Sequence, residues 1–193
     1  MLVNRRTSIK SILGLSFIGA SSFSVYKWIN CHHTIDPDSF LSRKELIAEL
    51  AETIIPSTDT PGAKEAKVEN YIINILLNCT ASVEQNLFLN GLTELESYTE
   101  RQFQRTFFNC SVNDRNKILE YFEQRGVYKY TLFNKVSNRL LGKSFFSQLK
   151  SLTIDGYCLS QLGATRGLAY DYIPGNYAAC ISLTPNQKSW ATK

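Results

Sequence analysis

This chain contains few of the side chains that enzymes most often use for catalysis. Its two histidines, His32 and His33, are adjacent and precede the first helical pattern, so the rest of the sequence contains none. Histidine is the usual general base and a frequent metal ligand at neutral pH. The chain beyond His33 therefore has no residue for a histidine-dependent hydrolase triad or a histidine-ligated zinc. The alternative to a chain without metal ligands is a metal site formed by the two histidines with Asp36.

The cysteines are spread too widely for the usual metal, redox or haem-attachment motifs. No two of them form a C-x-x-C pair. Their odd number leaves at least one thiol unpaired if disulfides form, and the sequence does not choose the connectivity. A Cys158–Cys180 disulfide, a bridge from Cys180 to another chain, and buried inert thiols all remain open. The five are Cys31, Cys79, Cys110, Cys158 and Cys180.

The glycines do not form a nucleotide-binding motif. Gly156, Gly163 and Gly167 lack the G-x-G-x-x-G spacing and follow a helical pattern rather than a strand. The sequence has no P-loop either. We therefore expect this chain to hold no flavin, dinucleotide or other cofactor of its own.

Several carboxylates share predicted helix faces, where paired acids could in principle transfer protons. On the polar face of an amphipathic helix, such groups are expected to be solvated surface charges. Asp155 directly precedes a glycine- and tyrosine-rich region and Asp171 lies within it, and we expect Asp171 to be a turn or interface residue. The two helical groups are Glu45, Glu49 and Glu52, and Glu96 with Glu100.

The elements that must position any site are predicted to be helices. Apolar residues recur at helical spacing over residues 44–55, 61–79, 82–103, 111–125 and 130–149. Ser42 and Glu45 have the spacing of a capping box, with Leu41 packing on Leu46, and Pro56 ends the first helix. Strand alternation and hairpin turns are scarce. The predicted fold class is all-α, a single compact multi-helix domain.

The last forty residues change character. Four glycines and four tyrosines are interspersed over residues 156–177, with no long apolar period. This composition predicts a short helix followed by an irregular, partly exposed tail.

The N-terminus has the layout of an export signal. Arg5, Arg6 and Lys10 precede an uncharged, mostly apolar run and then small residues. The paired arginines resemble the twin-arginine signal. We expect residues 1–30 to be this signal or a retained N-terminal anchor, residues 31–40 a linker, and residues 41–193 the helical domain.

Charge argues against a nucleic-acid partner. Four of the 21 basic residues lie in the first thirty residues, which contain no acidic residue, so 17 basic residues face 17 acidic ones in the remainder. A nucleic-acid-binding domain normally has a basic surface, and we expect no nucleic acid to bind.

Two stretches carry a family resemblance. LIAELAETIIPSTDTPGAKEAKVENYI at residues 46–72 and GYCLSQLGATRGLAYDYIPGNY at residues 156–177 resemble the gluconate 2-dehydrogenase subunit 3 family. The similarity spans roughly residues 4–182, although residues 82–128 carry no matching motif.

The resemblance implies a non-catalytic small subunit of a flavin-dependent alcohol or sugar dehydrogenase. The large subunit would be a glucose-methanol-choline-type flavoprotein that holds FAD, and a cytochrome c subunit with haem often accompanies it. The small subunit would carry the twin-arginine signal for the pair, which places it in the periplasm or on the periplasmic face of the inner membrane, attached through its N-terminus or through the complex. The alternative is a stand-alone exported α-helical binding module.

The glycine- and tyrosine-rich region is the predicted partner interface. Tyrosine offers large, rigid, amphipathic contact area, and Pro174-Gly175 is expected to form a turn. The alternative is that these rings cover the core of the domain itself. The predicted interface residues are Tyr157, Tyr170, Tyr172, Pro174, Gly175 and Tyr177.

Overall fold

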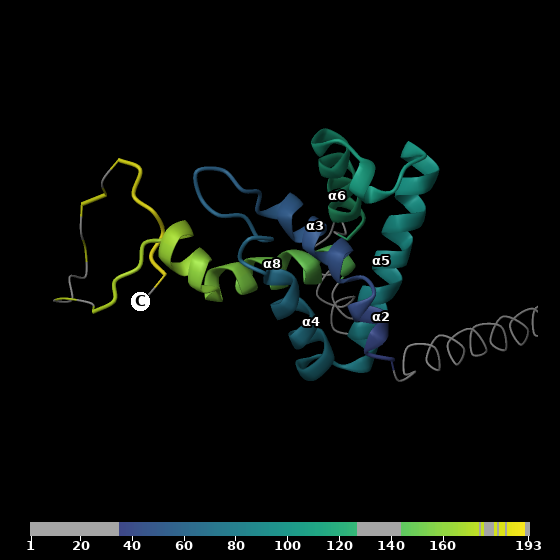
Figure 1. The fold of residues 1–193 in the computed structure, drawn as a ribbon, viewed down its shortest axis with the longest axis horizontal. Helices are drawn as coiled ribbons and strands as arrows, with labels where there is room; N and C mark the ends of the chain where they lie inside the picture. Colours follow the sequence, from purple (N-terminus) through teal and green to yellow (C-terminus); the bar gives the residue numbers. More distant parts are fainter. Residues whose placement is uncertain are drawn as a thin grey trace, which may run out of the picture.

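Helix α8 (Phe145–Leu159) runs through the middle of the fold, and the other long helices pack around it (Figure 1). The computed structural model describes residues 35–126 and 144–191, apart from 174, 176–179, 181 and 184. The described residues form helices and no named β-strand, which confirms the predicted all-α fold. In chain order they are α2 (Asp38–Leu41), α3 (Lys44–Ile54), α4 (Val68–Cys79), α5 (Ser82–Phe103), α6 (Val112–Gly126) and α8, with a 3-10 turn η1 (Phe107–Asn109) and a π-helical turn η2 (Gly163–Gly167).

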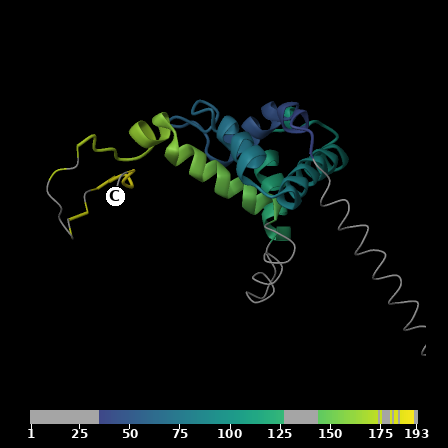
Figure 2. The ribbon, with the colours of Figure 1, turned by 90° about the horizontal axis from the view of Figure 1, so that it is seen from below.

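The core lies where α3, α4, α5 and α6 turn their apolar faces towards α8 (Figure 2). These faces follow the periodicity read from the sequence, because residues three and four apart share one side of a helix. Burying such side chains stabilises the domain by about 1.5–3 kcal/mol each relative to exposing them. Fully buried examples from the five helices are Leu50, Ile72, Leu92, Ile118 and Leu149.

Helices α5 and α8 approach closely because Gly91 has no side chain. A Cβ atom at Gly91 would lie 2.2 Å from Cγ of Phe145. The Phe145 ring packs edge-on against Phe88 and Phe122, with centroids 5.2 Å and 6.0 Å away. This aromatic cluster joins the first turn of α8 to α5 and α6.

The folded domain begins earlier than the expected boundary at Leu41. Helix α2 occupies residues that the sequence pattern predicts to be linker, and Phe40 is fully buried, 6.3 Å from the Phe88 ring centroid. The predicted capping box is wrong, because the Ser42 hydroxyl donates to the Ser39 carbonyl and α3 has no side-chain cap. Leu41 is 52% exposed and so does not pack as expected.

The other predicted helices differ from the structure mainly at their starts. Helix α4 begins at Val68 rather than at Pro61, after Lys67 in a left-handed conformation with φ 55°. The predicted Ser111–Asp114 cap of α6 is confirmed, since the Asp114 N–H donates to Ser111 Oγ at 3.2 Å. Ser144 caps α8, and the part of the predicted 130–149 helix before it lies outside the described residues.

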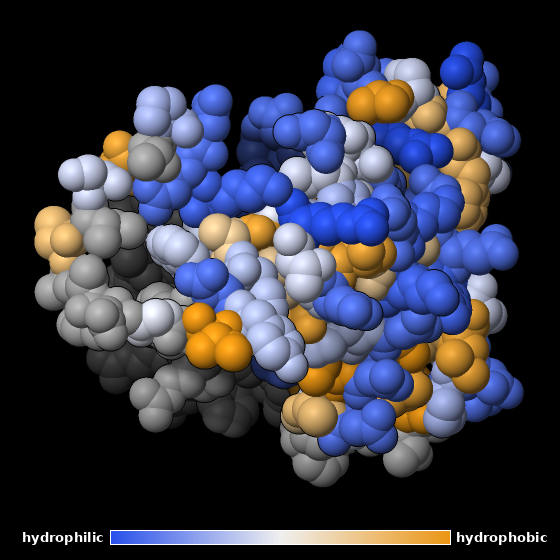
Figure 3. Space-filling view, turned by 60° about the vertical axis from the view of Figure 1, so that its left-hand side comes forward, coloured by the Kyte–Doolittle hydropathy of each residue, from blue (hydrophilic) through white to orange (hydrophobic). Residues whose placement is uncertain are grey.

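On the face shown in Figure 3, the described surface is mostly polar and its apolar side chains form separate groups. Among the described residues, no helix combines the length and apolar character needed to cross a bilayer. The predicted export residues Arg5, Arg6 and Lys10 lie outside the described part of the chain, as do Cys31, His32 and His33.

Candidate functional site

The two stretches that carry the family resemblance meet beside the C-terminal end of α8. Residues 55–67, which connect α3 to α4, lie against Tyr157, and the Tyr157 hydroxyl donates a hydrogen bond of 2.7 Å to the Pro61 carbonyl oxygen. Tyr157 and Pro61 are both buried. A hydrogen bond between residues 96 positions apart thus fixes the α3–α4 connection to the start of the tail.

Glycines allow the chain to wrap tightly around Tyr157. A Cβ atom at Gly167 would lie 2.4 Å from the Tyr157 hydroxyl, and one at Gly163 only 2.0 Å from the Tyr157 carbonyl oxygen. At Gly156 a Cβ atom would lie 2.7 Å from Cδ1 of Tyr71 on α4. These glycines therefore allow close packing between α8, η2 and α4.

Glu52 holds the α3–α4 connection from within. Its carboxylate accepts hydrogen bonds from the backbone N–H groups of Ser57 at 2.9 Å and Lys64 at 2.8 Å. The Gly62 backbone passes so close that a Cβ there would lie 2.4 Å from Glu52 Oε1. The expectation that Glu52 is a solvated surface charge is wrong, because its carboxylate replaces the regular backbone pairing that this irregular segment lacks.

Glu49 connects the same segment to α6. It forms ion pairs with Lys64 and with Arg115, the latter at 2.8 Å, and its side chain is only 17% exposed. The hydrogen bond from Lys64, and then Arg115, lower the pKa of Glu49 although burial opposes them. Arg115 also donates to the Phe108 carbonyl at 2.8 Å. The expectation of a solvated surface charge is wrong here too.

The remaining carboxylates agree better with expectation. Glu45 and Glu100 are exposed, and Glu96 forms an exposed ion pair of 3.4 Å with Arg43. Asp155 and Asp171 are also exposed. Among the described residues, no group of three or more His, Cys, Asp or Glu side chains is arranged to hold a metal ion.

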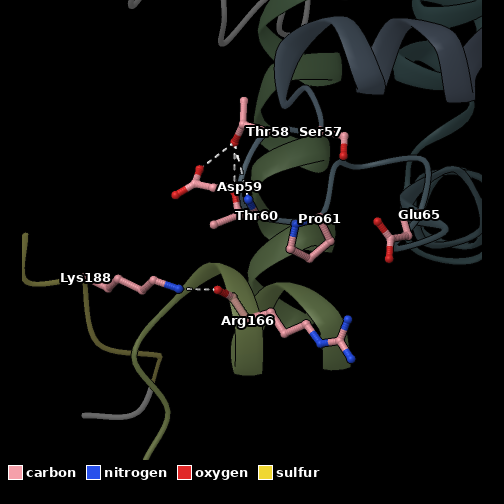
Figure 4. A pocket seen from close by; sticks show the side chains of 8 residues that line it. All are labelled: Ser57, Thr58, Asp59, Thr60, Pro61, Glu65, Arg166 and Lys188. Carbon is pink, nitrogen blue, oxygen red and sulfur yellow. Dashed lines mark hydrogen bonds between the residues drawn. The ribbon is translucent and has the colours of Figure 1, made fainter.

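An open hollow of about 440 Å³ lies between the α3–α4 connection and the start of the tail (Figure 4). Residues 57–61 and Glu65 form one wall, and Arg166 and Lys188 form the other. Lys188 Nζ donates to the Arg166 carbonyl, which brings the C-terminal part of the tail to η2. Apart from Pro61 the lining is polar, so the arrangement is suited to hydrogen-bonded recognition.

The tail beyond η2 is closed at its base by a parallel bridge. The Ala169 N–H donates to the Ser189 carbonyl at 2.8 Å, and the Ala191 N–H donates to the Ala169 carbonyl at 2.8 Å. The described residues between these segments lie away from the helices (Figure 1), and Tyr172 is 85% exposed. The predicted irregular, exposed tail is confirmed for its described residues.

The predicted interface residues separate into two groups. Tyr157 is 7% exposed and belongs to the core, which corrects its assignment to a partner surface. Tyr170, Tyr172 and Gly175 are exposed, and the interface prediction stands for them. Pro174 and Tyr177 lie outside the described residues.

The cysteines of the described residues are free thiols. Cys158 and Cys180 are exposed, and their disulfide stays a prediction. Cys110 is buried, and burial raises the pKa of its thiol. It fits the expectation of an inert structural cysteine.

Sequence reasoning misses the contribution of the α3–α4 connection. The pattern predicts a helix start at Pro61, whereas Pro61, Gly62 and Ala63 are buried residues of the irregular connection. The sequence signal that could have identified the role of Glu52 is its position four residues before Pro56, which ends the helix, with the Gly62-Ala63 pair following. No sequence pattern indicates that Arg166 lines the hollow, because its position depends on the long-range contact at Tyr157.

A family model described as Gluconate 2-dehydrogenase subunit 3 matches residues 42–175. The match covers more than half of the 193 residues and includes both the α3–α4 connection and the first part of the tail. Comparisons with curated proteins and with solved structures give no significant match. The matching family is that of a dehydrogenase subunit, which indicates an accessory role in an oxidoreductase complex. By this match, the chain belongs to the gluconate 2-dehydrogenase subunit 3 family.

Proposed function

We propose that this protein is the non-catalytic small subunit of a flavin-dependent alcohol or sugar dehydrogenase and that it escorts the folded flavoprotein through twin-arginine export. The partner is a glucose-methanol-choline-type flavoprotein that holds FAD. A cytochrome c subunit with haem can complete the complex. The small subunit itself holds no cofactor and contributes export and stabilisation.

One observation carries the proposal beyond family membership. The two stretches that carry the family resemblance are joined by the hydrogen bond between Tyr157 and Pro61, beside the base of a tail whose Tyr172 and Ile173 are 85% and 79% exposed. Large apolar groups on an anchored, projecting segment are typical of a protein–protein contact. They add nothing to the stability of the isolated domain, so a partner that covers them accounts for their presence.

Export of a folded pair requires a subunit that folds without disulfides. The described core consists of apolar helix faces, and its cysteine, Cys110, is a free thiol. A domain of this size can bury enough apolar surface to be stable in this way. Residues 1–30 supply the twin-arginine signal, which directs the complex to the periplasm or to the periplasmic face of the inner membrane.

Co-purification tests the proposal. The full chain carries an affinity tag and is co-expressed with a glucose-methanol-choline-type flavoprotein dehydrogenase subunit from the same genome. We expect flavin absorbance to co-elute with the tagged chain at a fixed ratio, and the chain expressed alone to be colourless. Separate elution of the two proteins would favour the stand-alone binding module instead.

A further inference from the structure

Residues 56–60, here called the tip loop, have an exposed surface and a fixed backbone. The Ser57 N–H is held by Glu52 at 2.9 Å, and the Thr58 N–H donates to the Thr60 carbonyl at 3.0 Å. Directly after the tip loop, the Pro61 carbonyl is held by Tyr157. Residues 56–59 are exposed. A surface loop that a rigid scaffold holds in one conformation is typical of a binding element.

The tip loop separates two hollows. On one side is the hollow of about 440 Å³ described above, and on the other is a second hollow of about 280 Å³. Ser57 lines both of them. The second hollow is walled by the end of α3 and by Val112 and Arg115 of α6. The tip loop is therefore a ridge that a partner can contact from both sides.

The charges of the larger hollow indicate what fits there. Asp59 and Glu65 lie on one wall, and Arg166 and Lys188 on the other (Figure 4). Among the described residues, the Arg166 guanidinium has no ion-pair or hydrogen-bond partner. The opposing charges do not favour a small anion or a metal ion. A polypeptide segment, which offers both N–H donors and carbonyl acceptors, matches both walls.

The tail needs a neighbouring contact surface to form a stable interface. A specific interface buries about 800 Å² per partner, whereas an aromatic side chain buries about 150–250 Å². Tyr170 and Tyr172, the exposed tyrosines described in the tail, cannot supply that area alone. The larger hollow adjoins the tail, because Arg166 and Lys188 line it and also flank the bridge that closes the base of the tail.

We propose that the tip loop and its two hollows form a second contact for the same dehydrogenase partner, which places a polar polypeptide segment of its own in the larger hollow. The inference rests on the proposed function, since it takes the flavoprotein as the occupant. Glu52 and Tyr157 are positioning residues in this contact, because they hold the backbone at Ser57 and Pro61 by hydrogen bonds. Glu52 also lines the smaller hollow, whereas Tyr157 is buried.

Binding measurements on full-length variants test this contact. Ser57→Trp blocks both hollows while keeping the backbone bond to Glu52, and Arg166→Glu reverses the charge of an exposed side chain. We expect each to raise the Kd for the purified flavoprotein by about tenfold or more, the size of an interface hot spot, with the melting temperature of the isolated subunit unchanged. Matched controls on α5, Asn90→Trp and Arg101→Glu, should bind like wild type.

The outcomes separate the two proposals. If wild type binds the flavoprotein and both variants bind equally well, the second contact is wrong and the proposed function stands. If wild type does not bind, the proposed function fails and the second contact fails with it. If Ser57→Trp lowers the melting temperature, Arg166→Glu alone decides, because its side chain is exposed and its guanidinium pairs with no group among the described residues.

Discussion

The Tyr157 hydroxyl lies 2.7 Å from the Pro61 carbonyl oxygen, and both residues are buried. This contact joins the α3–α4 connection to the last turns of α8. It therefore controls the geometry of both surfaces that we assign to the partner, the tip loop and the tail.

Tyr157→Phe should destabilise the isolated subunit by about 1–3 kcal/mol, because it leaves the buried Pro61 carbonyl without its donor. Urea unfolding monitored by circular dichroism measures the change. Tyr170→Phe is the matched control. Because Tyr170 is 44% exposed, this variant should lose little free energy of unfolding. Equal stability of Tyr157→Phe and wild type would show that this hydrogen bond does not hold the connection in place.

Gly163→Ala should cost about 1–3 kcal/mol, the usual range for overpacking. The new Cβ would lie 2.0 Å from the Tyr157 carbonyl, so the backbone of η2 has to move. Gly175→Ala is the control, because a Cβ atom there would meet no atom of the described residues within 4 Å beyond its chain neighbours, and no cost is expected. Thermal melts of both variants make the comparison, and a neutral Gly163→Ala contradicts the tight wrapping around Tyr157.

Glu49 should make stability depend on pH in the acid range. Its pKa in the folded state is lowered below the ordinary value of 4.5 by Lys64 and Arg115. The stabilisation is therefore complete above the unfolded-state pKa and is lost as pH falls through the folded-state pKa. Glu49→Gln should be less stable than wild type at neutral pH, and the difference should shrink on acidification.

Chemical unfolding at several pH values between neutral and about pH 3 measures this dependence. Glu45→Gln is the control, since Glu45 is exposed on the same helix. A stability difference for Glu49→Gln that stays constant down to the lowest pH would mean that the ion pairs with Lys64 and Arg115 do not contribute.

Arg5→Lys with Arg6→Lys should retain the protein in the cytosol and leave its flavoprotein partner there too. The twin-arginine signal is read by its receptor through the arginine pair, and lysine keeps the charge, so a loss cannot be due to charge alone. Fractionation of cells that express both proteins, with immunoblots for each, gives the result. Normal export of the partner in this variant rules out the escort role.

Helix positions are predictable because the apolar period is a local property of the sequence. The stripes of α4, α5 and α6 identify their buried faces, and Ser111 identifies the start of α6 correctly. Phe40 falls in the predicted linker, because four helical residues after Pro37 have too short a pattern to recognise.

The candidate site is only partly predictable, because long-range contacts build it. Glu49 and Glu52 have the spacing of a solvated helix face, and only the return of the connection over α3 gives them partners. Tyr157 and Tyr172 both belong to the glycine- and tyrosine-rich region, yet one is 7% and the other 85% exposed. What separates them is that α8 continues through Tyr157, so that its ring meets Pro61.

Titration of the purified flavoprotein into the full-length chain tests the central claim, that this subunit binds the dehydrogenase through its tail. We expect saturable binding by wild type, and for Tyr170→Ala combined with Tyr172→Ala a Kd raised by about tenfold or more with an unchanged melting temperature. Leu41→Ala, at a 52% exposed residue on α2, should bind like wild type. No binding by wild type, or equal binding by the double tyrosine variant, would contradict the claim.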